Sequence, residues 1–72
     1  MTSGSSPGLK WTDSLDLAIE LAERHSEVDP TRINFVDLMR WVMELPGFED
    51  DASRSNEKIL EAIQAAWIEE RD

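Results

Sequence analysis

The chain has 72 residues, the length of one small domain, and its 16 acidic and 7 basic residues give a net charge of -9. A domain of this size hides only about 60% of its unfolded surface, so its core is thin and leaves little room for a deep substrate cavity. The charge repels nucleic acid and anionic membranes, and it attracts a basic protein surface or a metal cation. Composition therefore predicts a binding protein whose partner is neither nucleic acid nor a membrane.

Cysteine is absent from the sequence, which excludes disulfides, zinc–thiolate sites and direct ligation of an iron–sulfur cluster by this chain. No apolar run approaches the roughly 20 residues of a membrane span. The first eight residues lack the basic and apolar regions of a secretory signal. We therefore expect a cytoplasmic protein with residues 1–7 as a flexible N-terminal tail and residues 8–72 as a single domain.

The first predicted helix covers residues 14–25, where apolar side chains recur at helical spacing. Thr12 or Ser14 is the expected N-cap, because a hydroxyl oxygen can accept a hydrogen bond from a free backbone N–H of the first turn. Asp29 and Pro30 then predict a turn, since proline forces the residue before it out of helical geometry.

The rest of the chain predicts two more helices and a short strand. Residues 32–35 alternate polar and apolar side chains as a strand does, and pairing them with residues 10–12 would make a minimal two-stranded β ribbon. A second helix is expected over residues 36–45, and a third from a cap at Ser53 or Ser55 to residue 71. The fold class is thus mainly α, with three helices in a helix-turn-helix or winged-helix core.

Five large aromatic side chains are the expected centre of this core. They are Trp11, Phe35, Trp41, Phe48 and Trp67. His25, the only histidine, is expected on the surface at the end of the first helix, where it complements the helix dipole. The chain has no glycine-rich phosphate loop, and nucleophilic catalysis would lack its usual base. We therefore predict that the protein is not an enzyme.

Acidic residues recur along the first helix at alternating spacings of three and four, which places them on one ridge with neighbouring Cβ atoms about 5–6 Å apart. This acidic ridge consists of Asp13, Asp16, Glu20, Glu23 and Glu27. Like charges at this spacing destabilise a helix by a few tenths of a kcal/mol per pair. One interpretation is a solvated helix face, but such a face normally mixes charges. We therefore expect the ridge to bind a basic partner.

A second acidic cluster follows the second helix and continues into the third. It consists of Glu49, Asp50, Asp51, Glu57 and Glu61. Carboxylates near the start of a helix also favour its dipole, so part of the cluster has a structural explanation. Its oxygens otherwise suit hard or borderline divalent cations and Fe³⁺ without strong selectivity. The spacing does not match the calcium loop of an EF-hand, so we expect weak metal binding.

Two motifs carry a resemblance to a known family. They are GLKWTDS at residues 8–14 and SNEKILEAI at residues 55–63, with Asp29-Pro30, Phe35, Asp37, Trp41 and Trp67 in register. From residue 8 to the C-terminus the sequence resembles the IscX (YfhJ) family, small acidic proteins of the bacterial iron–sulfur cluster assembly system.

The resemblance implies a modified winged-helix fold and binding to the cysteine desulfurase IscS through an acidic surface, in competition with the frataxin homologue. It also implies weak, exchangeable iron binding by carboxylates, with a role as iron donor or as regulator of the desulfurase. The chain departs from the family at Pro46 and Gly47, where acidic residues are common, and at Ala52, where proline is common. These changes remove charge and stiffness from the expected iron site in the second acidic cluster.

Two alternatives belong to other classes of protein. One is an acidic protein-interaction adaptor without a metal role, which iron titration with and without the desulfurase would distinguish. A DNA-binding winged helix would need a basic recognition face, which a chain with a net charge of -9 lacks.

Overall fold

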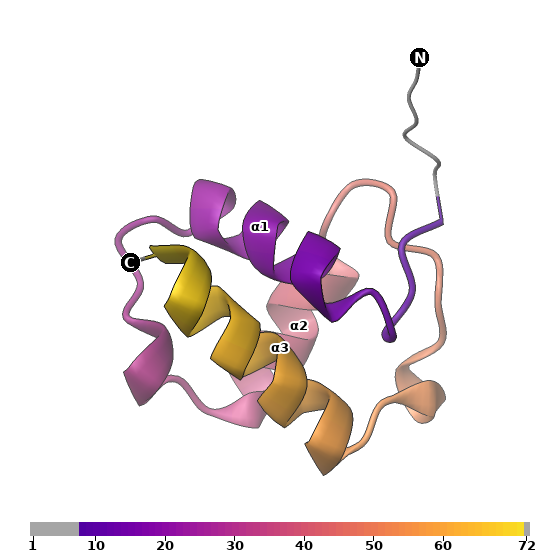
Figure 1. The fold of residues 1–72 in the computed structure, drawn as a ribbon. Coiled ribbons are helices and arrows are strands. Elements are labelled where there is room, and N and C mark those ends of the chain that lie inside the picture. The colour runs from indigo at the N-terminus through magenta and orange to yellow at the C-terminus, as the bar shows by residue number, and fades with distance from the viewer. Residues whose placement is uncertain (1–7, 72) are drawn as a thin grey trace.

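The computed structural model describes residues 8–71, so the predicted flexible tail over residues 1–7 lies outside the described residues. Three α-helices follow one another: α1 (Ser14–Arg24), α2 (Phe35–Met43) and α3 (Glu57–Arg71). Two short 3₁₀ helices, η1 (Pro30–Arg32) and η2 (Ala52–Arg54), precede α2 and α3 (Figure 1). The predicted mainly helical, three-helix architecture is confirmed. Within residues 8–71, no helix has the length and apolar character that crossing a membrane requires.

The predicted β ribbon is not found among residues 8–71, whose isolated β contact is one parallel bridge between Leu9 and Phe48. Residues 32–35 do not form a strand, because η1 extends to residue 32 and α2 begins at residue 35. Local hydrogen bonds explain the difference. The Asp29 carboxylate accepts from the Thr31 N–H at 3.1 Å, and the Asn34 side chain accepts from the Asp37 N–H at 2.8 Å, so both helices are capped within the segment.

The expected N-caps are also corrected. Asp13 is the N-cap residue of α1 without a side-chain capping bond, because its carboxylate accepts instead from the Lys10 N–H at 2.9 Å. At α3, the Asn56 side chain accepts from the Ile59 N–H at 3.0 Å. Ser55 does not cap this helix, since its hydroxyl donates to the Ala52 carbonyl at 2.9 Å. Neighbouring polar groups therefore decided which side chain caps each helix.

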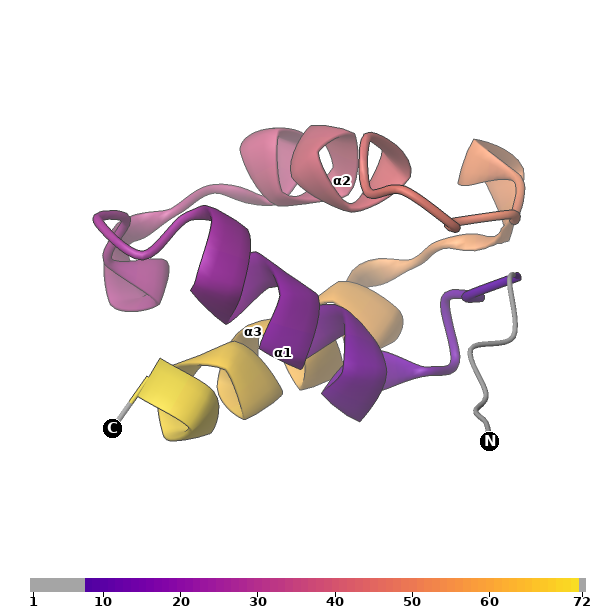
Figure 2. The same cartoon turned by 90° about the horizontal axis from the view of Figure 1, so that it is seen from above.

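The helices form two layers. α1 packs mainly against α3, and the two helices run in the same direction, so that their C-terminal ends reach the same edge of the molecule (Figure 1). α2 forms the second layer and lies across one face of the α1–α3 pair (Figure 2). The core draws on all three helices, on the segment before α1 and on the turn after α2. Its buried members are Trp11, Leu17, Ala18, Leu21, Leu38, Val42, Leu45, Leu60, Ile63 and Trp67.

The aromatic residues occupy the core to different depths. Trp11 and Trp67 are each 1% exposed, which confirms their predicted burial. Trp41 is half-buried and packs edge-on against Trp67, with ring centroids 6.0 Å apart. The predicted surface position of His25 is corrected, because its ring packs against Trp41 at a centroid distance of 4.9 Å. Its position at the C-cap of α1 agrees with the prediction.

Replacing Trp67 with alanine should leave the protein largely unfolded. Truncating a buried tryptophan costs about 3–5 kcal/mol, which approaches the whole stability of a domain this small. Thermal unfolding followed by circular dichroism measures the effect, with Leu15→Ala as control because Leu15 is 56% exposed. A Trp67→Ala protein that melts as the wild type does would contradict this packing.

Candidate functional site

The acidic ridge is shorter in the structure than its sequence spacing suggests. Asp16, Glu20 and Glu23 lie within α1, opposite its buried residues. Asp13 sits at the N-cap with its carboxylate turned to the Lys10 N–H, and Glu27 lies beyond the C-cap. The structure thus brings three of the five predicted residues together on one helix and places the other two in the flanking turns.

The ridge keeps most of its negative charge exposed. Asp16 and Glu23 are exposed, whereas the half-buried Glu20 pairs with Arg24 at 3.2 Å. The Arg24 and Glu20 side chains are 49% and 36% exposed, so solvent screens this pair and it contributes little to stability. α1 would therefore present a negatively charged face to a basic partner surface.

The second acidic cluster divides into two parts. Glu49, Asp50 and Asp51 lie in the loop before η2, whereas Glu57 and Glu61 are exposed one turn apart on α3. Among residues 8–71, no group of three or more histidine, cysteine or acidic residues is arranged to hold a metal ion. The five residues therefore do not converge on one centre as their proximity in sequence suggests.

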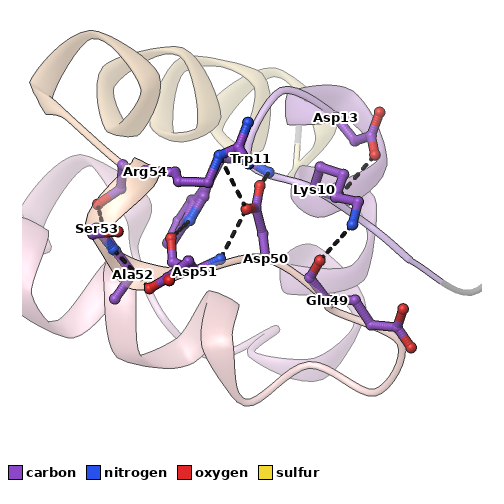
Figure 3. A network of polar contacts seen from close by, with 10 residues as sticks. Lys10, Trp11, Asp13, Glu49, Asp50, Asp51, Ala52, Ser53 and Arg54 are labelled. Atoms are coloured by element: carbon purple, nitrogen blue, oxygen red, sulfur yellow. Dashed lines mark hydrogen bonds and ion pairs between the residues drawn. The ribbon is translucent and has the colours of Figure 1, made fainter.

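Asp50 is engaged in a set of contacts that we call the Asp50 clamp (Figure 3). Its Oδ2 accepts from the Trp11 backbone N–H at 3.0 Å, and its Oδ1 accepts from the Asp51 N–H at 2.8 Å. The Arg54 Nε lies 3.5 Å from the same Oδ1, and the Asp50 side chain is only 10% exposed. Both carboxylate oxygens are thus used by the protein itself.

The clamp extends along the chain on both sides of Asp50. The Trp11 indole N–H donates to the Asp51 carbonyl at 2.8 Å, and the Lys10 ammonium donates to the Glu49 carbonyl at 2.7 Å. Upstream, the Gly47 carbonyl accepts from the N–H groups of residues 8 and 9, each at 2.9 Å. Gly47 has a φ of 85°, a conformation that glycine adopts without steric cost. The loop is therefore fastened to the segment before α1 from Gly47 to Asp51.

Sequence reasoning did not find this clamp. One signal was present: a buried indole N–H needs an acceptor, and Trp11 was expected in the core. The sequence does not show which acceptor is used, because Trp11 and Asp50 are 39 positions apart. Asp50 consequently entered the predicted metal-binding set, although its burial and contacts give it a structural role.

The clamp lowers the pKa of Asp50. The Trp11 N–H has the largest effect, followed by the Asp51 N–H, and the charges of Arg54 and Lys10 act in the same direction. Each of these groups stabilises the ionised carboxylate over the protonated acid. The folded-state pKa therefore lies below the unfolded value of about 3.9. Stability from this group is complete above the unfolded value and is lost as pH falls through the folded-state pKa.

Asp50→Asn should lower the melting temperature near neutral pH and should flatten the loss of stability that the wild type shows on acidification below about pH 4. The matched control is Glu49→Gln, because Glu49 takes part in the clamp through backbone atoms. Melting curves between pH 2 and pH 7, conditions chosen to span the titration, measure both effects. Equal stability and equal acid response for the two variants would contradict the assigned role of Asp50.

Comparison with known proteins places the chain among proteins of one process. A family model described as iron-sulphur cluster assembly matches residues 9–72, which include α1, the Asp50 clamp and α3. An uncharacterized protein of Pseudomonas aeruginosa is 70% identical over 64 residues, covering 89% of this chain and 97% of that relative. The similarity therefore extends over nearly the whole length of both proteins.

Proposed function

The chain belongs to the IscX family of iron–sulfur cluster assembly proteins, and on that premise we propose that it is an accessory protein that binds the cysteine desulfurase IscS. The observation that carries the proposal is the exposed, negatively charged face of α1 formed by Asp16, Glu20 and Glu23. Binding requires a basic surface on the desulfurase. The frataxin homologue, if it uses the same basic surface, competes with this chain for it.

Charge complementarity of this kind acts mostly on the rate of association. Opposite charges steer two proteins toward each other, and salt weakens the attraction beyond about 8 Å at physiological ionic strength. A chain without cysteine holds no cluster through thiolates, so its effect on assembly comes from occupying the desulfurase or from bringing iron to it. We therefore propose regulation of the desulfurase and delivery of iron as its two modes of action.

Iron is cargo in this proposal. The second acidic cluster has Asp50 committed to the clamp, which leaves the exposed Glu57 and Glu61 as the best-placed pair. Carboxylates one helical turn apart lie about 5–6 Å apart at their Cβ atoms, and with water they can bind a hard cation. Two ligands of this kind support weak, exchangeable binding of Fe²⁺ or Fe³⁺ at an open surface.

The second candidate function is an acidic adaptor without a metal role. The engagement of both Asp50 oxygens favours it, because the most buried carboxylate of the cluster is used for folding. Both candidates use the acidic ridge as the partner-binding surface, and they differ in whether the chain binds iron.

Family membership also supports two further proposals. We propose that the three-helix core is a modified winged helix, in which the Leu9–Phe48 bridge is the β contact among residues 8–71. We also propose that the protein is cytoplasmic, because a fold held by packing without disulfides is typical of that compartment.

Replacing Asp16, Glu20 and Glu23 with lysine should weaken binding to purified IscS by at least about tenfold, because the ridge then repels a basic partner. Calorimetry at low and raised salt measures the affinity, and circular dichroism checks the helices. The control with the same change in net charge replaces the exposed Glu44, Glu61 and Glu69 with lysine. If the ridge variant binds IscS as tightly as the wild type and salt has no effect, the acidic ridge is only a solvated helix face.

Replacing both Glu57 and Glu61 with glutamine should remove most of the iron binding, which calorimetric titration under anaerobic conditions measures. The control Asp16→Asn with Glu20→Gln removes equal charge from α1. In the wild type, Mn²⁺ should compete and acidification toward pH 4–5 should release the metal, because protons compete for carboxylates. Tight binding that resists both treatments would show that the assigned ligands are wrong.

A further inference from the structure

A hollow of about 420 Å³ lies where the C-terminal ends of α1 and α3 meet. We call it the α1–α3 notch. Its lining includes the apolar side chains of Ile19, Ala22 and Val28. Two carboxylates from different helices also line it, Glu23 from α1 and Glu70 from α3. An apolar surface beside two carboxylates suits a ligand that has a hydrocarbon body and a cationic end.

The backbone adds to the negative potential of the notch. α1 ends at Arg24 and α3 at Arg71, and the C-terminal end of each helix carries a partial negative charge from its free carbonyls. Both ends face the same edge of the molecule (Figure 1). Arg71 also lines the notch, but its guanidinium pairs with Asp29 at 3.1 Å. Two carboxylates and two helix ends thus favour a cation there.

We propose that the α1–α3 notch receives one arginine side chain of the protein partner. The inference rests on the proposed binding to the desulfurase and extends that surface from α1 onto α3. Glu23 belongs to both the ridge and the notch, so a partner lying along the ridge reaches the notch at its C-terminal end.

Arginine fits the notch better than lysine does. Its planar guanidinium can donate to two carboxylates at once and can stack on an aromatic ring, while its methylene stem covers apolar surface. The notch offers each of these partners: Glu23 and Glu70, the ring of His25, and the apolar lining. His25 is held against Trp41 at 4.9 Å, so its ring is already oriented before a partner binds. A lysine ammonium would gain the charge attraction without the stacking.

The first test compares two neighbouring residues of α3. Glu69 and Glu70 are both exposed, and Glu70 lines the notch. Glu70→Gln should weaken binding to IscS by about tenfold, whereas Glu69→Gln should change it by less than about twofold. Ser26 also lines the notch, and Ser26→Trp should block binding by filling it. Equal affinities for the Glu69 and Glu70 variants would overturn the inference and leave the ridge proposal standing.

The second test does not depend on the desulfurase. A peptide, acetyl-Ala-Arg-Ala-amide, is titrated into the ¹⁵N-labelled protein, and the indole N–H of Trp67 and the amide of Glu70 are followed by NMR. Both signals should shift and saturate with the arginine peptide, less with a lysine peptide, and not with the neutral citrulline analogue. Glu70→Gln should reduce the shifts and Glu69→Gln should keep them. Shifts that are absent, or equal for the citrulline peptide, would refute the arginine notch even if the chain binds IscS. If the peptide shifts are as expected but the chain does not bind IscS, the proposed function is refuted instead.

Discussion

The burial of Trp11 is the constraint on which the surrounding structure depends. A buried indole ring carries an N–H group that needs an acceptor, and the Asp51 carbonyl supplies it at 2.8 Å. The backbone N–H of the same residue finds the Asp50 carboxylate at 3.0 Å. Meeting both needs places the loop between α2 and α3 against the segment that leads into α1. This attachment lies directly before α1, the helix that carries the acidic ridge and that begins at Ser14.

Carboxylates in this protein have two separate roles, which their burial and neighbours determine. Asp50 is 10% exposed and surrounded by N–H groups and an arginine, so its ionised form stabilises the fold. Asp16 and Glu23 face solvent on α1, where their charge remains available to a partner. The net charge of -9 therefore does not describe one uniform surface. It combines a structural anion with a set of anions that we propose to act in recognition.

The packing of α1 on α3 links surfaces that are distant in the sequence. Because the two helices run in the same direction, their C-terminal ends share one edge of the molecule (Figure 1). Glu70 thereby joins Glu23 at the notch, and the proposed binding surface extends across two helices. His25 also lines the notch, and its ring is held by packing against Trp41 at a centroid distance of 4.9 Å.

The sequence by itself determined the features that depend on short spacings. Hydrophobic periodicity located all three helices to within a few residues, the three-and-four spacing placed Asp16, Glu20 and Glu23 on one face of α1, and two motifs indicated the family. The strand at residues 32–35 was wrong because Asp29 and Asn34 cap their own segment, a competition that periodicity does not register. Only the tertiary structure decided the role of Asp50 and the position of Glu70 beside Glu23 at the notch. Those depend on contacts between residues far apart in the chain, such as the 39 positions from Trp11 to Asp50, and local pattern carries no information about which distant groups meet.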